Sequence, residues 1–125
     1  MKLTIDRDGS LDEVMVTLRF LDLIESDFHA LKTELEILSI SYKSRAIGSH
    51  KLKRHAESGA SIGIDITIEN APLCRKILQE YGVGTRDIWI SYFTEYDHGG
   101  FTIPNWVTSI AHECQLTIQI SYMGT

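Results

Sequence analysis

The stretch that most constrains the fold is IGIDITIE at residues 62–69, in which apolar and polar side chains alternate without a break. Successive side chains of a β-strand point to opposite faces of a sheet, so this pattern predicts a strand with four isoleucines inward. Asp65, Thr67 and Glu69 would then lie on the other face, in water. A strand that is wet on one side favours a largely antiparallel sheet.

Three further stretches alternate with the same period and predict three more strands. They are residues 14–20, 88–96 and 116–122. The inward side chains of the last strand are expected to be Leu116, Ile118, Ile120 and Tyr122. A weaker strand is expected within residues 37–46. Residues 3–5, which precede the turn signal Asp8-Gly9, are expected to form a hairpin with residues 14–20.

Three other stretches have the apolar spacing of helices. Ser26 can cap the first, Pro72 suits the first turn of the second, and Pro104 opens the third. Gly82 supplies a C-terminal stop for the second helix. The apolar stripes are, in order, Phe28, Leu31, Leu35 and Leu38; Leu73, Cys74, Ile77, Leu78 and Tyr81; and Ile103, Val107, Ile110, Ala111 and Cys114. Trp106 borders the third stripe.

The order of these elements predicts a single α+β domain over residues 1–125. We expect a largely antiparallel sheet of about five strands with three helices packed on one face. A chain of 125 residues can bury enough apolar surface to fold without disulfides or metals. The longest irregular stretch, residues 46–61, is expected to be a mobile or functional loop.

Composition narrows the classes of partner. The net charge of −5 argues against nucleic acid as the main partner, because phosphate contacts need a basic surface. No apolar run approaches the roughly 18 residues of a membrane span, and the first ten residues do not resemble a secretory signal. We therefore expect a cytoplasmic protein without membrane contacts. Cys74 and Cys114 lack metal-ligand spacing and are expected to be reduced, buried thiols.

Charge is unevenly distributed along the chain. Residues 1–36 are rich in Asp and Glu, residues 43–55 hold a basic cluster, and no Lys or Arg follows Arg86. The acidic C-terminal third is either a solvated surface or a face that steers a basic partner. The basic cluster has Tyr42 as its one neighbouring aromatic residue, so a solvated loop is favoured there over a phosphate or RNA site.

The segment FTEYDHGGFTIP, residues 93–104, gathers two carboxylates, a histidine and aromatic side chains. Gly99 and Gly100 suit a tight turn, which alone explains part of the pattern. Glu95, Asp97 and His98 could carry out acid–base catalysis, could contact a partner, or could decorate a plain loop. The five histidines lie in five separate settings, so the spacing predicts no metal site and no cofactor.

Residues 90–122, ISYFTEYDHGGFTIPNWVTSIAHECQLTIQISY, resemble the C-terminal half of a small bacterial α/β domain family. The chain is also similar in size and style to immunity proteins of polymorphic toxin and contact-dependent inhibition systems. The resemblance covers about a quarter of the chain. It implies a non-enzymatic, cytoplasmic protein that binds a cognate toxin domain, and it carries over no catalytic residue.

We therefore expect a binding protein whose partner is a toxin domain. Acidic side chains would form charge pairs with the partner and aromatic side chains would be buried against it. The residues expected to carry binding are Asp87, Glu95, Tyr96, Asp97, His98, Phe101 and Trp106. Two alternatives remain open: a small hydrolase that uses Glu95, Asp97 and His98, and a structural module that forms a homodimer through an exposed edge or face of the sheet.

Overall fold

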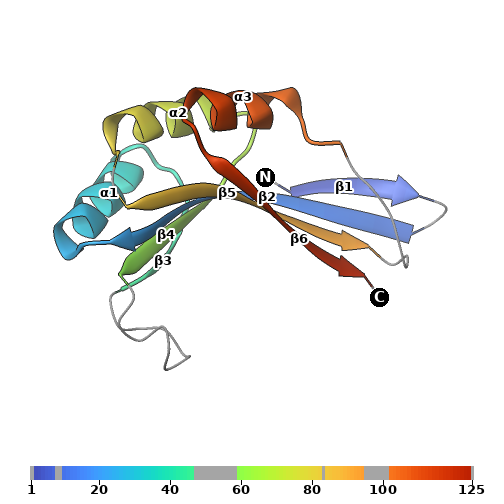
Figure 1. Cartoon of the computed structure of the whole chain (residues 1–125), viewed down its shortest axis with the longest axis horizontal. Coiled ribbons are helices and arrows are strands. Elements are labelled where there is room, and N and C mark those ends of the chain that lie inside the picture. The colour runs from blue at the N-terminus through green and yellow to red at the C-terminus, as the bar shows by residue number, and fades with distance from the viewer. Residues whose placement is uncertain (1, 8–9, 47–58, 83, 95–101, 125) are drawn as a thin grey trace.

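The structure is a computed structural model, and it describes residues 2–7, 10–46, 59–82, 84–94 and 102–124, with side chains described for 14–46, 59–82, 84–93 and 102–122. Strands and helices alternate along this part of the chain (Figure 1). In order they are β1 (Lys2–Arg7), β2 (Ser10–Leu23), α1 (Glu25–Ile37), β3 (Lys43–Arg45), β4 (Ala60–Asp65), α2 (Ala71–Glu80), β5 (Thr85–Thr94), α3 (Asn105–Glu113) and β6 (Thr117–Gly124).

The strands of the described residues form one sheet in the order β3-β4-β2-β5-β6, and β1 pairs with β2 beside this path. The 14-residue strand β2 organises the sheet, because β5 lies along one of its edges. Along its other edge, β1 pairs with residues 10–15 and β4 pairs with residues 17–23. The expected hairpin between residues 3–5 and β2 is confirmed by the antiparallel pairing of β1 with β2.

The predicted α+β class is confirmed, and the sheet is mixed. β2 pairs antiparallel with β1, β4 and β5, and β3 pairs antiparallel with β4. β5 and β6 are parallel. A parallel pair needs a crossover connection rather than a hairpin, and α3 lies within the connection from β5 to β6.

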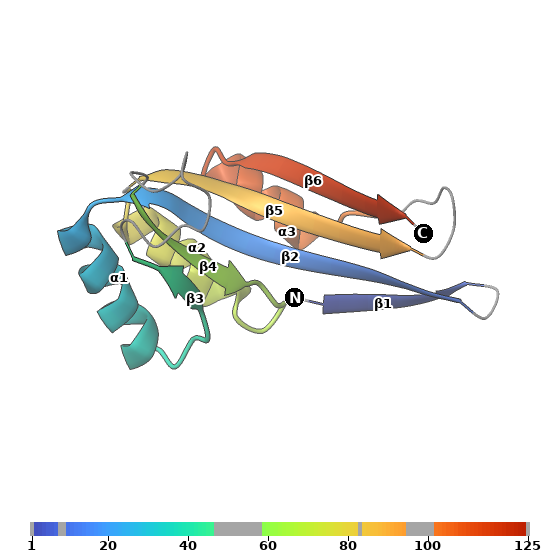
Figure 2. The same ribbon diagram turned by 90° about the horizontal axis from the view of Figure 1, so that it is seen from below.

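The helices lie differently with respect to the strands. Figure 1 shows α2 and α3 next to one another above the sheet, with α1 at the end of the molecule where β3 and β4 lie. The view from below in Figure 2 has the sheet in front of α2 and α3. The strands therefore have one face toward α2 and α3 and a second face directed away from them.

The hydrophobic core follows the alternation of the strands. In β4, Ala60, Ile62 and Ile64 are buried, whereas Ser61 and Gly63 are half-buried and Asp65 is exposed. β2 and β5 alternate in the same way, and the helices add their predicted stripes. The core residues contributed by β2, β5 and the helices include Val14, Val16, Leu18, Phe20, Ile88, Ile90, Tyr92, Phe28, Leu31, Leu35, Cys74, Ile77, Leu78, Val107 and Ile110.

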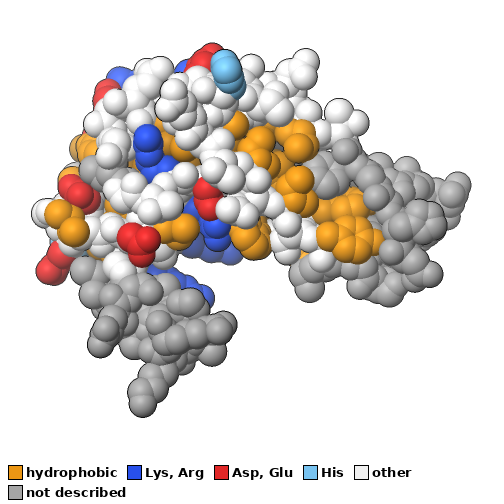
Figure 3. Space-filling model, in the orientation of Figure 1, with side chains coloured by type: hydrophobic (Ala, Val, Ile, Leu, Met, Phe, Trp, Pro, Cys, Tyr) orange, Lys and Arg blue, Asp and Glu red, His pale blue; other side chains and the backbone are white. Residues whose placement is uncertain are grey.

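Two expectations about inward side chains are wrong. β4 ends at Asp65, so Ile68 lies in the turn before α2 and is 60 % exposed. In β6, Ile120 and Tyr122 are 55 % and 46 % exposed, although they have the parity of the core residues. Figure 3 accordingly shows hydrophobic side chains at the surface in the half of the molecule that holds the end of β6. Alternation fixes the face to which a side chain points but not whether another layer covers that face.

The predicted start of α1 is also wrong. Its N-cap is Ile24, which has an extended backbone and makes no side-chain capping bond, and Ser26 lies inside the first turn. β2 runs almost directly into the helix, which leaves no room for a separate capping residue. Glu25 and Asp27 lie in the first turn, where their negative charges interact favourably with the helix dipole.

A β-bulge interrupts the pairing of β2 with β4 near the end of β2. Phe20 pairs with Ile62 and Leu23 pairs with Ala60, so two residues of β2 face one residue of β4. Asp22 adopts a left-handed backbone with φ of 55° at this position, as one residue of a bulge often does.

Candidate binding face

The structure describes two of the seven predicted binding residues. Glu95, Tyr96, Asp97, His98 and Phe101 lie outside the described residues. Asp87 is on β5 and buried, whereas Trp106 is on α3 and half-buried against the hydrophobic core. Asp87 has the opposite parity to the core residues Ile88 and Ile90, so its side chain points away from the helix layer that contains Trp106. The structure therefore does not bring these two residues together.

The second face of the sheet, called the outer face below, consists of the strand residues that alternate with the core. Strand pairing places them in rows across the sheet. One row contains Lys43, Gly63, Arg19, Asp87 and Thr117. The next row contains Asp65, Thr17, Trp89 and Gln119. Most of these side chains are half-buried or exposed, so the face combines charged, aromatic and hydroxyl groups at an accessible surface.

An ion pair occupies the centre of the outer face. The Arg19 guanidinium donates from Nε to Asp87 Oδ1 at 2.7 Å and from Nη2 to Asp87 Oδ2 at 2.5 Å. The Arg19 side chain is 28 % exposed and that of Asp87 is 9 % exposed. Two parallel bonds between a guanidinium and a carboxylate fix both side chains in one geometry. The Asp87 carboxylate is thus already paired within the chain.

Trp89 completes this central cluster. The Arg19 guanidinium carbon lies 4.4 Å from the centroid of the Trp89 ring, which is a cation–π contact. The indole Nε1 of Trp89 donates to Ser91 Oγ at 2.8 Å. Arg19 is therefore held from two sides, by a carboxylate and by an aromatic face. Contacts within the chain thus hold all three side chains in place.

A hollow of about 480 Å³ lies beside this cluster, over the pairing of β3, β4 and β2. Its lining includes three basic residues and three residues with hydroxyl groups: Arg19, Lys43, Arg45, Thr17, Ser44 and Ser61. Lys43 and Arg45 lie on the edge strand β3 and are exposed. The hollow is consequently a positively charged feature on a chain with a net charge of −5.

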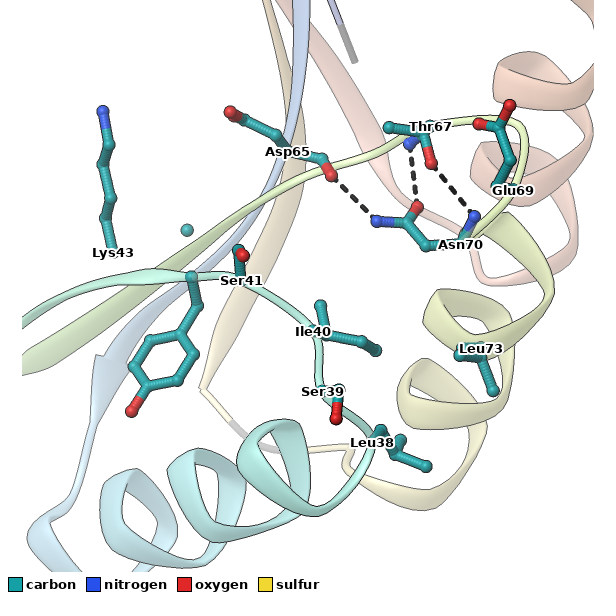
Figure 4. A pocket seen from close by; sticks show the side chains of 12 residues that line it. Leu38, Ser39, Ile40, Ser41, Lys43, Asp65, Thr67, Glu69, Asn70 and Leu73 are labelled. Carbon is teal, nitrogen blue, oxygen red and sulfur yellow. Dashed lines mark hydrogen bonds between the residues drawn. The ribbon is translucent and has the colours of Figure 1, made fainter.

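A second hollow, of about 510 Å³, lies between the end of α1, the start of α2 and β4 (Figure 4). Apolar side chains from Leu38, Ile40 and Leu73 line one side of it. Figure 4 shows Lys43 and Asp65 pointing away from the two helices. The hollow therefore combines an apolar wall with a charged rim.

Asn70 shapes the wall of this second hollow. Its Nδ2 donates to the Asp65 carbonyl at 3.0 Å, and its Oδ1 accepts from the Thr67 N–H at 2.8 Å (Figure 4). The Asn70 N–H donates in turn to Thr67 Oγ1 at 3.0 Å. This reciprocal pair closes the turn between the end of β4 and the start of α2 at Ala71. The polar groups of Asn70 are thus used by the fold.

Neither cysteine has the setting of an activated nucleophile. Both are free, as predicted. The predicted burial is confirmed for Cys74 and is wrong for Cys114, which is half-buried. Burial raises the pKa of the Cys74 thiol from 9.0 to about 11. The pKa of Cys114 is also raised, chiefly by burial. A reactive cysteine needs the opposite shift, because the thiolate is the nucleophile.

Arg19, Trp89 and the row that contains Gly63 were not among the residues predicted from the sequence. A signal for them was present, because Arg19 is the single cation in the apolar stretch 14–20 and Trp89 lies in the stretch 88–96. Parity places both of these side chains on the wet face. The ion pair between Arg19 and Asp87 could not be predicted from the sequence, because the two residues are 68 positions apart.

Comparison of the chain with protein-family models, with curated proteins and with solved structures found no match. None of the helices among the described residues is long and apolar enough to cross a membrane. No group of three or more His, Cys, Asp and Glu side chains in the described part of the chain is arranged to hold a metal ion.

Proposed function

We propose that this chain is a non-enzymatic binding protein that uses the outer face of its sheet to hold and inhibit a cognate toxin domain in the cytoplasm, as immunity proteins do. The observation that carries this proposal is the ordering of Arg19 between Asp87 and Trp89 at the centre of that face. Arginine and tryptophan are enriched among the residues that dominate binding energies at protein interfaces.

Preorganisation is the physical reason to place the interface here. A long side chain normally loses rotamer freedom when a partner immobilises it, at a cost of about 0.5–1.5 kcal/mol. Arg19 has already lost that freedom to Asp87 and Trp89, so a partner that contacts the cluster does not bear this cost again. The face is also wide enough for a partner, since its rows run from β3 to β6.

The proposal also covers the position of the helices, the effect of the net charge and the remaining predicted contact residues. All three helices would cover one face of the sheet and leave the outer face to the partner, which the burial of alternate strand residues supports. The net charge of −5 would steer a basic toxin domain toward the chain. Glu95, Tyr96, Asp97, His98 and Phe101 remain proposed additional contacts, whereas Trp106, predicted from the sequence as a contact, lies in the helix layer on the opposite side of the sheet and is not part of this interface.

The test is affinity purification from the native host with the unaltered chain, with Trp89→Ala and with Lys76→Gln as a control on the far side of the molecule. A stoichiometric partner whose toxicity the chain suppresses should be retained by the unaltered chain and the control. Trp89→Ala should weaken binding by about 2 kcal/mol, or roughly thirtyfold. A partner that binds Trp89→Ala with unchanged affinity would place the interface elsewhere.

One observation favours self-association as a second candidate function. β6 is an edge strand that, among the described residues, pairs with β5 alone, and its eight residues Thr117–Gly124 carry no charged side chain. Uncharged edge strands with exposed apolar residues such as Ile120 are templates for pairing with another chain. The absence of charge means that two copies would not repel one another along this edge.

The pairing between two copies has a defined register. Antiparallel pairing of β6 centred on Ile120 would place Ile118 opposite Tyr122 of the other copy, with Ile118, Ile120 and Tyr122 of both copies on one face. Light scattering at two protein concentrations tests this arrangement. Ile120→Lys should convert a dimer to a monomer, whereas Ile68→Lys, at another exposed isoleucine, should leave the dimer intact. A monomer at both concentrations for the unaltered chain would rule out this candidate function.

A further inference from the structure

Gly63 lies inside β4, where a glycine needs an explanation. Glycine in the interior of a strand weakens it by roughly 0.5–1 kcal/mol relative to alanine, because glycine loses more backbone freedom on folding. The backbone of Gly63 is not left-handed, so its φ does not require glycine. A Cβ at this position would meet Thr17 Cγ2 at 3.4 Å, which is an ordinary contact. Neither backbone geometry nor packing therefore demands a glycine here.

The neighbours of Gly63 across the sheet are two cations. Gly63 pairs with Lys43 of β3 on one side and with Arg19 of β2 on the other. Adjacent strands are about 4.8 Å apart, so the two cationic residues start from backbones roughly 10 Å apart with no side chain between them. This gap forms the floor of the 480 Å³ hollow.

The other groups around the hollow set its charge. Arg45 lies two residues beyond Lys43 on β3, and it pairs with Ser61, whose hydroxyl lines the same hollow. Asp87 takes Nε and Nη2 of Arg19, which leaves Nη1 for another acceptor. Asp65 lies two residues from Gly63 on β4 and accepts from Thr17 Oγ1 at 3.3 Å. Two cations, Lys43 and Arg45, are thus left without a carboxylate partner among the described residues.

We propose that the groove over Gly63 binds a compact phosphate-class oxyanion between Lys43 and Arg19. A tetrahedral anion presents oxygens in several directions, so it can accept from Lys43 on one side and from Arg19 Nη1 on the other. A carboxylate presents two oxygens on one side and cannot bridge the gap as well. The missing side chain of Gly63 lets the anion approach the backbone. This site does not depend on the proposed toxin partner, because the residues that form it all belong to this chain.

The experiment titrates the ¹⁵N-labelled chain with inorganic phosphate, sulfate and acetate at constant ionic strength and follows amide shifts by NMR. Saturable shifts for Gly63 and its neighbours are expected with phosphate and sulfate, and much weaker ones with acetate. Two variants test the site: Lys43→Gln with Arg45→Gln removes the charge, and Gly63→Val fills the floor. Lys76→Gln is the control, because it removes an exposed cation from α2, which lies on the other face.

Each variant should lower the phosphate affinity by at least about tenfold, whereas Lys76→Gln should leave it unchanged. Gly63→Val should also fold at least as stably as the unaltered chain, since valine favours strands. If Gly63→Val failed to fold, the charge variant would decide alone. Non-saturable shifts, equal affinities for acetate and phosphate, or an equal loss in Lys76→Gln would each overturn the proposal.

Discussion

Arg19 and Asp87 face one another across β2 and β5 and are joined by two hydrogen bonds, of 2.7 Å and 2.5 Å. Strand register places the two residues directly opposite, so the ion pair forms without distortion of the sheet. Asp87 is almost completely shielded from water, whereas Arg19 retains some exposure. The pair is therefore worth more than a surface salt bridge, although the remaining exposure limits its strength.

The first prediction is a measurable coupling between these two residues. Asp87→Asn and Arg19→Met should each lower the free energy of unfolding, and the double variant should lose less than the sum. We expect a coupling of about 1–2 kcal/mol from urea unfolding of the four proteins. Arg75 and Glu113 form an exposed pair at 2.8 Å, and the same cycle there should give a smaller coupling. If the losses in the free energy of unfolding from Asp87→Asn and Arg19→Met were additive, the two side chains would not interact, contrary to the structure.

The second prediction concerns the turn at Asn70. Asn70→Ala removes the bonds to the Thr67 N–H and the Asp65 carbonyl, and it should cost about 2 kcal/mol in thermal or urea unfolding. Asn70→Asp keeps the acceptor and places a negative charge near the start of α2, so it should cost much less. Equal losses in the two variants would mean that the acceptor for Thr67 contributes nothing.

The third prediction is that substitution to glycine just after α1 and just after α3 stabilises the fold. Ser39 and Gln115 have φ of 57° and 54° just after α1 and α3, in the left-handed region that disfavours side chains. The following amide bonds back into each helix, Ile40 to Leu35 at 2.9 Å and Leu116 to Ala111 at 2.8 Å. This is the Schellman arrangement, in which the left-handed position is usually glycine.

Ser39→Gly and Gln115→Gly should therefore each raise the free energy of unfolding by up to about 1 kcal/mol. Ser41→Gly is the matched control for Ser39, because Ser41 is exposed and has no positive φ. That control should be neutral or destabilising, since it only adds freedom to the unfolded chain. A loss of stability in Ser39→Gly would show that its hydroxyl matters more than its backbone.

The parts of the fold that depend on local periodicity were predictable from the sequence. The alternation at residues 62–69 predicted β4, and the stripe from Leu73 to Leu78 predicted α2. The end of β4 was not predictable in this way, because Thr67 alternates correctly and yet binds Asn70 to form a turn. Side-chain hydrogen bonds of Thr and Asn compete with strand pairing, and periodicity does not register them.

Features that join distant parts of the chain were harder to predict from the sequence. The parallel pairing of β6 with β5 depends on how α3 crosses the sheet, and the exposure of Ile120 depends on where that helix layer stops. The charged partner of Arg19 was hidden for the same reason, since several acidic residues had the correct parity. The predicted binding residues Glu95, Tyr96, Asp97, His98 and Phe101 lie outside the described residues and stay predictions.

The last prediction follows from the buried thiol of Cys74, whose pKa rises from 9.0 in the unfolded chain to about 11 in the fold. Below pH 9.0 the thiol is protonated in both states, so it causes no change in stability with pH. Between pH 9.0 and 11 the unfolded chain releases the proton while the folded chain keeps it. The free energy of unfolding should therefore fall by about 2–3 kcal/mol across this window.

Cys74→Ala isolates this effect, because it removes the titrating group. Other groups, such as Tyr42, whose pKa is raised chiefly by its hydrogen bond to Glu36, are present in both proteins and so cancel in the comparison. Urea unfolding of both proteins from neutral pH to pH 11 should give curves whose difference shrinks as the pH rises. The same burial predicts that Cys114 reacts with a thiol reagent well before Cys74. A constant difference between the two curves would mean that the Cys74 thiol ionises as easily in the fold as in the unfolded chain.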